Sequence, residues 1–366
     1  MQDYDDGESA EAAGTLLTTF AAHFPRVFDR VHKTLGELAG SRVQATKTAA
    51  LCALAHVAPR YQTVPRSAKL ANSMKRHLIA TCLSATPRQA KHAVLAMCGM
   101  YKSTAPVEDL IGRLVADDVL TADNEHLEAI LRSLAAVANA APHVFEPSSL
   151  DAAQFALQTV LCGPLPADYR RQRRTVSDTA RCRAAAIKTM VNIARCLVRV
   201  EGQEADAELA ATMCLTNLTR MLEVCVCVCV CVCVCVCVCV RAPRHLVFLT
   251  AVPLQNDGNP PTGSIDLSAT DRAVLRRHAL GGLLRIVRVR SFDAQVTPAI
   301  WRCITNAMAD DDREVRSYAL RKLHKGLVAR AGALSVQYLA CFVVFAQDPD
   351  PYVQLVANSC VLKARR

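Results

Sequence analysis

The stretch Asn124–Ala138, with the sequence NEHLEAILRSLAAVA, shows most clearly which fold the chain adopts. Its apolar side chains recur every three or four residues, at Leu127, Ile130, Leu131, Leu134 and Val137. This spacing places them on one face of an α-helix, so the segment predicts an amphipathic helix whose apolar face is covered by neighbours. A second stripe of the same kind runs from Val315 to Leu327.

The same period extends over most of the chain. We expect helices near 14–22, 24–40, 42–58, 67–83, 87–100, 106–116, 124–138, 148–161, 177–199, 205–223, 270–287, 295–309, 312–328, 335–346 and from 351 onward. Helix follows helix with short turns and without strand alternation, at a spacing of about 40 residues per helix pair. The pattern predicts an all-α fold, a HEAT/armadillo-like α-solenoid of paired antiparallel helices.

Composition divides this predicted solenoid into segments. Residues 1–13 are acidic, and we expect them to be disordered. Residues 14–223 and 269–366 carry HEAT-like helical repeats, with a loop near 163–176. Between the two blocks, residues 224–268 hold a low-complexity run of valine and cysteine followed by a proline-rich flexible insertion.

The run Val224–Val240 alternates valine and cysteine without a break. It could form a strand, although both faces would then be apolar. It could cross a membrane, but it is shorter than the about 20 residues that a spanning helix needs. A TG-dinucleotide repeat read in frame also encodes this alternation, and we favour that interpretation.

Charge and cysteine usage limit the classes of function. The 366 residues carry a formal net charge of +10, which suits an acidic partner, whether nucleic acid or protein. Eight of the 18 cysteines lie in the Val-Cys run and the others stand singly in apolar helical segments, typical of reduced core thiols. We therefore expect a nuclear or cytosolic protein. The acidic start is unlike a secretory signal peptide.

Catalytic and metal-binding patterns are missing from the sequence. Cys52 and His56 share a helix face, but two ligands do not make a zinc site. The aspartates at 310–312 precede a predicted helix, where its dipole favours acids, and no spaced metal ligands follow them. We expect no enzyme activity, no cofactor, no metal, no membrane association and no small-molecule substrate.

Two basic groups are candidate anion-binding sites. The first lies in the loop near 163–176 and could be a nuclear localisation signal or an anion patch; it comprises Arg170, Arg171, Arg173 and Arg174. The second could line one ridge and comprises Arg276, Arg277, Arg285, Arg288 and Arg290. Either group could instead be a solvated face that keeps an alanine-rich solenoid soluble.

Several stretches resemble the precocious-dissociation-of-sisters family, the HEAT-repeat regulators of cohesin. They are TPRQAKHAV at 86–94, the segment 134–145 ending in APHVF, AAIK at 185–188, DREVR at 312–316, RKLHKGL at 321–327, the segment 334–338 and AQDP at 346–349. The motifs occur in family order, and the Val-Cys run and proline-rich insertion fall between two family helices. The chain looks like a middle-to-C-terminal portion, so we expect an exposed apolar face near Phe20–Phe28, where preceding repeats would stack.

This resemblance implies a scaffold that binds the kleisin subunit of cohesin together with cohesin release and establishment factors. It implies indirect chromatin association in the nucleus and roles in sister chromatid cohesion, mitosis, cell division and DNA repair. The signature residues that could contact a partner are Lys91, Lys322, His324 and Lys325. The alternative is a generic armadillo/HEAT adaptor, such as a transport or assembly scaffold.

Overall fold

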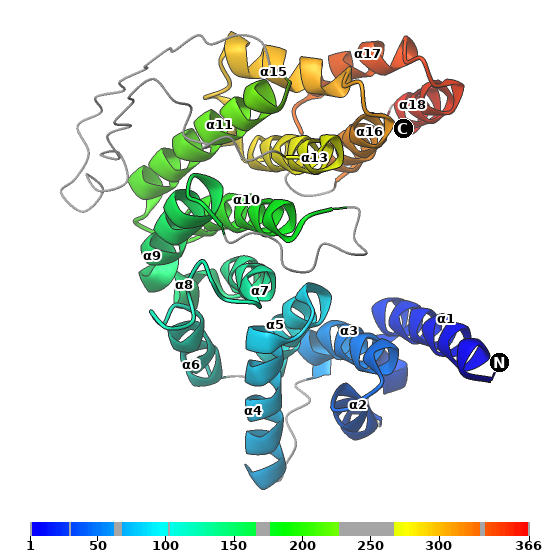
Figure 1. Ribbon diagram of the computed structural model, residues 1–366, viewed down its shortest axis with the longest axis vertical. Coiled ribbons are helices and arrows are strands. Elements are labelled where there is room, and N and C mark those ends of the chain that lie inside the picture. Colours follow the sequence, from blue (N-terminus) through cyan, green and yellow to red (C-terminus); the bar gives the residue numbers. More distant parts are fainter. Residues whose placement is uncertain are drawn as a thin grey trace. The chain divides into compact units, whose positions relative to one another are not determined.

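The computed structural model describes residues 2–28, 31–61, 68–101, 103–165, 176–226, 267–329 and 334–364 (Figure 1). Every regular element in these ranges is a helix, which confirms the predicted all-α class. The chain divides into two compact units, Met1–Phe155 and Ala156–Arg366.

The first unit is built from helices in two layers. Its elements are α1 (Gln2–His23), η1 (Pro25–Phe28), α2 (His32–Ala39), α3 (Gln44–Tyr61), α4 (Ala68–Ser84), α5 (Pro87–Met100), α6 (Ala105–Leu114), α7 (Leu127–Ala140), α8 (Pro142–Phe145), η2 (Glu146–Ser148) and α9 (Ser149–Gln154). Helices α1, α3, α5 and α7 pack in succession as one layer. Helices α2, α4 and α6 cover α3, α5 and α7, one each, which is the stacked-pair arrangement of a HEAT-like solenoid.

Burial follows the sequence pattern in this layer. The five apolar positions of the α7 stripe are all buried, at 3% exposure or less. Helix α3 is buried all round at Ala49–Leu54 because α1, α2 and α5 all pack against it. Its small alanines let these neighbours approach closely, which explains an alanine- and leucine-rich core with few aromatics.

The start of α5 is specified by its own sequence. The Thr86 hydroxyl accepts a hydrogen bond from the Gln89 backbone N–H, while the Gln89 side chain accepts one from the Thr86 backbone N–H. Pro87 occupies the first helical position, where no N–H is needed. The buried Gln89 amide also donates to the Gln44 side-chain oxygen at 2.7 Å and to the Thr48 hydroxyl at 2.9 Å. A capping box therefore also ties α5 to α3.

The second unit repeats the two-layer arrangement. Its elements are η3 (Phe155–Leu161), which begins at the boundary, then α10 (Asp178–Leu197), α11 (Glu204–Val226), α13 (Ala269–Ile286), α14 (Arg290–Asp293), α15 (Pro298–Met308), α16 (Arg313–Leu327), η4 (Val336–Cys341), α17 (Phe342–Ala346) and α18 (Pro351–Ala364). Helices α10, α13, α16 and α18 pack in succession, and α11, α15 and α17 form the second layer beside them (Figure 1).

Three aspartates link successive helices of the α10–α13–α16–α18 layer. Asp271 accepts from the Ser177 backbone N–H at 2.8 Å. Asp310 binds Arg276 through two hydrogen bonds of 2.6 and 2.9 Å. Asp348 binds Arg316 in the same way at 2.7 and 3.2 Å. Each aspartate lies at or just before the start of the later helix, and the arginine–aspartate link recurs in the last two of the three contacts.

The structure departs from the expected helix boundaries in several places, among them 335–346, which is the 3₁₀ element η4 followed by α17. Helix α1 begins at Gln2 and runs through the acidic segment expected to be disordered; its alanines and glutamates favour a helix. The helix expected at 24–40 is interrupted between η1 and α2, and Pro25 begins the 3₁₀ turn. The helix expected at 148–161 changes from α9 into the π-helical η3 at Phe155. Most of the segment 224–268 lies outside the described residues.

The apolar face expected near Phe20–Phe28 is present. Phe20, Phe24 and Val27 are 45%, 58% and 67% exposed, and the Phe20 and Phe24 rings lie 5.8 Å apart. Phe28 turns inward and is buried. The prediction of an exposed face is therefore confirmed for η1 and the end of α1.

Candidate functional site

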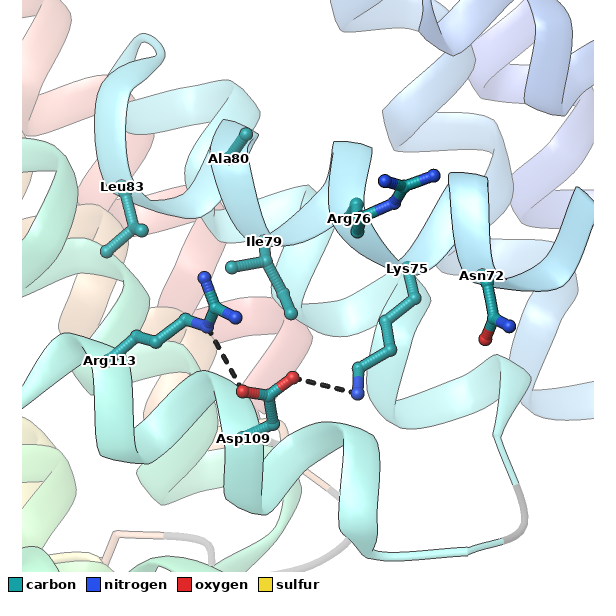
Figure 2. A pocket seen from close by; sticks show the side chains of 8 residues that line it. All are labelled: Asn72, Lys75, Arg76, Ile79, Ala80, Leu83, Asp109 and Arg113. Carbon is teal, nitrogen blue, oxygen red and sulfur yellow. Dashed lines mark hydrogen bonds and ion pairs between the residues drawn. The ribbon is translucent and has the colours of Figure 1, made fainter. Parts of the chain in front are cut away.

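A groove lies between α4 and α6 in the first unit (Figure 2). It has a volume of about 490 Å³ and is lined by Asn72, Lys75, Arg76, Ile79, Ala80, Leu83, Asp109 and Arg113. Asp109 lies between two cations, 2.8 Å from the Lys75 ammonium and 3.1 Å from the Arg113 Nε. Hydrogen bonds from Lys75 and Arg113 hold the pKa of Asp109 below its usual value. The groove therefore keeps an excess of positive charge, with Lys75, Arg76 and Arg113 against Asp109, and has apolar patches beside them.

Basic side chains on three successive helices of the second unit form what we call the cationic cluster. It comprises Arg195 of α10 and Arg199 in the turn after it, Arg285 of α13 and Arg288 in the turn after it, and Lys322 of α16. Arg199 and Arg288 each follow the last residue of α10 and α13 by two positions, so each arginine pair lies at the C-terminal end of its helix. Packing of α10 on α13 and of α13 on α16 then brings the charges together.

The cations of this cluster depress one another's protonation. Burial, followed by the charges of Arg285, Arg199 and Arg288, lowers the pKa of Arg195 to about 10. Burial and the neighbouring Arg288 and Arg199 also lower the pKa of Arg285. The pKa of Lys322 is lowered by burial and then by Arg285, Arg321 and Arg288. The strongest charges that act on these groups are therefore other cations.

Tyr318 of α16 lies beside the cationic cluster. The Lys322 ammonium is 5.0 Å from the centre of its ring, and the Arg277 guanidinium carbon is 5.6 Å away. Both distances suit cation–π attraction. Gly281 makes room for the ring, because a Cβ at that position would lie 2.8 Å from the Tyr318 Cε1 and hydroxyl oxygen.

The ridge expected from the second basic group is divided by the structure. Arg285 and Arg288 belong to the cationic cluster, whereas Arg276 turns to Asp310 and serves the link between repeats. Arg290 is exposed at the start of α14. A continuous ridge is therefore wrong, because a helix directs residues 276 and 285 to different faces.

The signature residues have different environments. Lys322 lies in the cationic cluster and Lys325 is exposed. His324 is half-buried, and its Nε2 is buried without a hydrogen-bond partner among the described residues. Lys91 is half-buried on α5. Desolvation, followed by the positive charge of Lys91, lowers the pKa of His56 on α3. The other basic group, Arg170, Arg171, Arg173 and Arg174, lies outside the described residues.

The signature motifs also contain structural pairs that sequence reasoning missed. Arg316 of DREVR and Asp348 of AQDP form a buried, two-fold hydrogen-bonded ion pair. Arg316 further donates to the carbonyl oxygens of Asp310 and Asp311. Asp312 caps α16 by accepting from the Glu314 and Val315 backbone N–H groups. The sequence did offer a signal for this pair, because Arg316 lies just after the start of one predicted helix and Asp348 just before the start of another.

The described residues hold no convergent catalytic set. Among them, no three potential metal ligands lie together. Burial raises the pKa of the Cys98 and Cys214 thiols to about 12, so both stay protonated at neutral pH. Cys52 is buried, as expected for a core thiol, and His56 is exposed. In the part of the chain that the structure describes, no helix has both the length and the apolarity needed to span a membrane.

Comparisons with known proteins give one informative match. No curated protein matches the chain. A crystal structure of an engineered protein aligns with 98% of this chain and 96% of its own. Its 12% sequence identity and TM-score of 0.31 are too low to indicate a shared fold or function. The model of the family described as sister chromatid cohesion protein PDS5 matches residues 1–366. The chain therefore belongs to the PDS5 family of sister chromatid cohesion proteins.

Proposed function

We propose that this protein is a non-enzymatic scaffold that regulates sister chromatid cohesion by binding the kleisin subunit of cohesin and the cohesin release and establishment factors. It acts in the nucleus, on chromatin-bound cohesin, through mitosis and DNA repair. The family match across residues 1–366 carries this proposal, because the family is defined by cohesion.

The architecture supports binding rather than catalysis. Stacked helix pairs present long surfaces on which extended partners can lie. The described residues offer such surfaces in both units, as the α4–α6 groove and as the cationic cluster. A scaffold needs these surfaces to be held rigidly, and the recurring aspartate links of the second unit supply that rigidity.

The proposal is tested by affinity purification of the tagged full chain from dividing cells at low salt. We expect cohesin subunits in the eluate, and the kleisin to remain bound when purified components are mixed. The matched control is Leu134→Asp, which places a charge in the buried α7 stripe and disrupts the stack.

Two outcomes would contradict the proposal. One is a folded wild-type chain that recovers no cohesin subunit at low salt. The other is equal recovery by wild type and the Leu134→Asp variant, since capture would then not depend on the folded stack. Recovery of cargo peptides with no chromatin fraction would favour the adaptor alternative.

A further inference from the structure

We propose that the cationic cluster of α10, α13 and α16, together with Tyr318, binds a carboxylate-rich segment of a partner protein. The inference rests on the proposed function, because it specifies the chemistry of one partner that a cohesin-bound scaffold would hold. It concerns only the second unit, where the three helices pack directly in order.

The first argument is charge imbalance. The strongest charges acting on Arg195, Arg285 and Lys322 come from arginines, and no carboxylate appears among them. Gathering like charges destabilises the fold, and the half-buried Arg195 and Arg285 also lose hydration without gaining an opposite charge among these neighbours. Uncompensated groups of this kind concentrate at functional sites, where a ligand supplies the missing charge.

The second argument is unused hydrogen-bonding capacity. The Nε atoms of Arg195 and Arg277 are buried and have no hydrogen-bond partner among the described residues. Buried donors of this kind are uncommon in folded proteins. A carboxylate fits a guanidinium because its two oxygens accept two parallel N–H bonds.

The third argument comes from the same helices. Arg276 of α13 and Arg316 of α16 each bind an aspartate through two hydrogen bonds. The same residue type on the same two helices is thus already used for carboxylate recognition. In the cationic cluster, carboxylates of an incoming acidic segment would bind the arginines as Asp310 binds Arg276 and Asp348 binds Arg316.

A nucleic acid fits these observations less well. Single strands need aromatic faces on which bases can stack. Tyr318 is the aromatic side chain beside the cationic cluster, and Lys322, Arg277 and His278 already lie around its ring. The cations are also confined to three helices and the turns after two of them, and Arg195, Arg285 and Arg288 are half-buried, whereas a nucleic-acid backbone is followed by an extended, exposed stripe of charge.

The test is fluorescence anisotropy with the full chain and a labelled glutamate-rich peptide, beside a peptide in which every glutamate is glutamine. We expect binding of the acidic peptide that weakens as salt rises. Arg285→Gln with Lys322→Gln should weaken it by about tenfold, as expected for losing charge-assisted hydrogen bonds. The matched control, Arg42→Gln with Arg302→Gln, removes the same charge from exposed positions and should bind like wild type.

The inference is overturned if both double variants lose affinity equally, because net charge alone would then explain binding. It is also overturned if duplex DNA or inorganic polyphosphate binds more tightly than the peptide and depends on the same two residues. Thermal melts establish that each variant is folded. If the chain recovers cohesin but does not bind the acidic peptide, this inference fails and the proposed function stands. If the chain binds the peptide but recovers no cohesin, the proposed function fails and the anion-binding site stands.

Discussion

Helices α13 and α16 use basic side chains in two opposite ways. Arg276 in the middle of α13 and Arg316 in the first turns of α16 bind Asp310 and Asp348 in ion pairs whose carboxylates are buried. Toward the end of each, Arg285 and Lys322 lie among other cations. The contrast separates arginines that link successive repeats from basic residues whose strongest charged neighbours are other cations. Net charge in the sequence does not distinguish the two sets.

The largest effect is expected from breaking a buried pair. Arg316→Met leaves the Asp348 carboxylate buried without its cation, which should lower the free energy of unfolding by about 3–5 kcal/mol. Urea denaturation measures the loss. Adding Asp348→Asn should restore part of it, because the uncompensated charge is gone. Arg321→Met, on an exposed position of the same helix, should change stability by no more than about 0.5 kcal/mol. Equal losses in Arg316→Met and Arg321→Met would contradict the structural role of the pair.

A smaller effect is expected where Tyr318 approaches the backbone of α13. Gly281→Ala places a methyl group against the Tyr318 ring and should cost about 1–3 kcal/mol by overpacking. The ring would also be displaced from Lys322 and Arg277, so acidic-peptide binding should weaken. Gly112→Ala is the control: nothing lies within 4 Å of its added Cβ, and we expect it to be neutral or stabilising. Similar thermal shifts for both variants would show that Tyr318 moves away freely.

Charge removal from the cationic cluster should have the opposite sign to charge removal from a pair. Arg285→Gln relieves repulsion by Arg288 and Arg199 and should raise the free energy of unfolding by about 0.5–1 kcal/mol at low salt. The gain should shrink at 1 M salt, where screening acts within about 3 Å. Arg276→Gln, which breaks the pair with Asp310, should destabilise at both salt concentrations. A destabilised Arg285→Gln variant would mean that an internal anion already compensates this residue.

The smallest effect is expected in the first unit, at the rim of the α4–α6 groove. Asp109→Asn removes an ion pair whose carboxylate is 35% exposed, so solvent screening limits the loss to at most about 1 kcal/mol. The folded-state pKa of Asp109 is lowered, so its contribution is present above the unfolded value of about 3.9 and is lost as pH falls through the folded value. Urea midpoints of wild type and variant should therefore converge in acid. A difference that grows in acid would contradict the assigned sign.

Much of the fold could be predicted because the sequence signals for a helix come from residues that are close together in the chain. The apolar stripe Leu127–Val137 and the helix near 87–100 each depend on nearby residues in the chain, and the structure confirms both. Boundaries were predicted less well where a proline or a change of helix type intervened, as at Pro25 and Phe155. The sequence segments 1–13 and 224–268 could be separated by composition, but composition does not decide whether a segment is helical.

Only part of the cationic cluster could be predicted from the sequence. Basic residues could be grouped by spacing, and Arg285 and Arg288 were grouped correctly. Their meeting with Arg195 and Lys322 depends on which helices are neighbours, and those residues are far apart along the chain. The pairing of Arg316 with Asp348 is likewise a contact between separate repeats.

By itself, the sequence determined that the chain is a series of amphipathic helices and that these helices belong to the cohesin regulators, because helical period and ordered motifs are local properties. Tertiary structure alone decided which arginines are neutralised and which are gathered with like charges. The physical reason is that hydrogen bonds and charge–charge energies depend on distance in space. The stretch Asn124–Ala138 forms its helix against any neighbours that bury its apolar face. The environments of Arg276 and Arg285, by contrast, depend on which charged residues lie next to each of them in space.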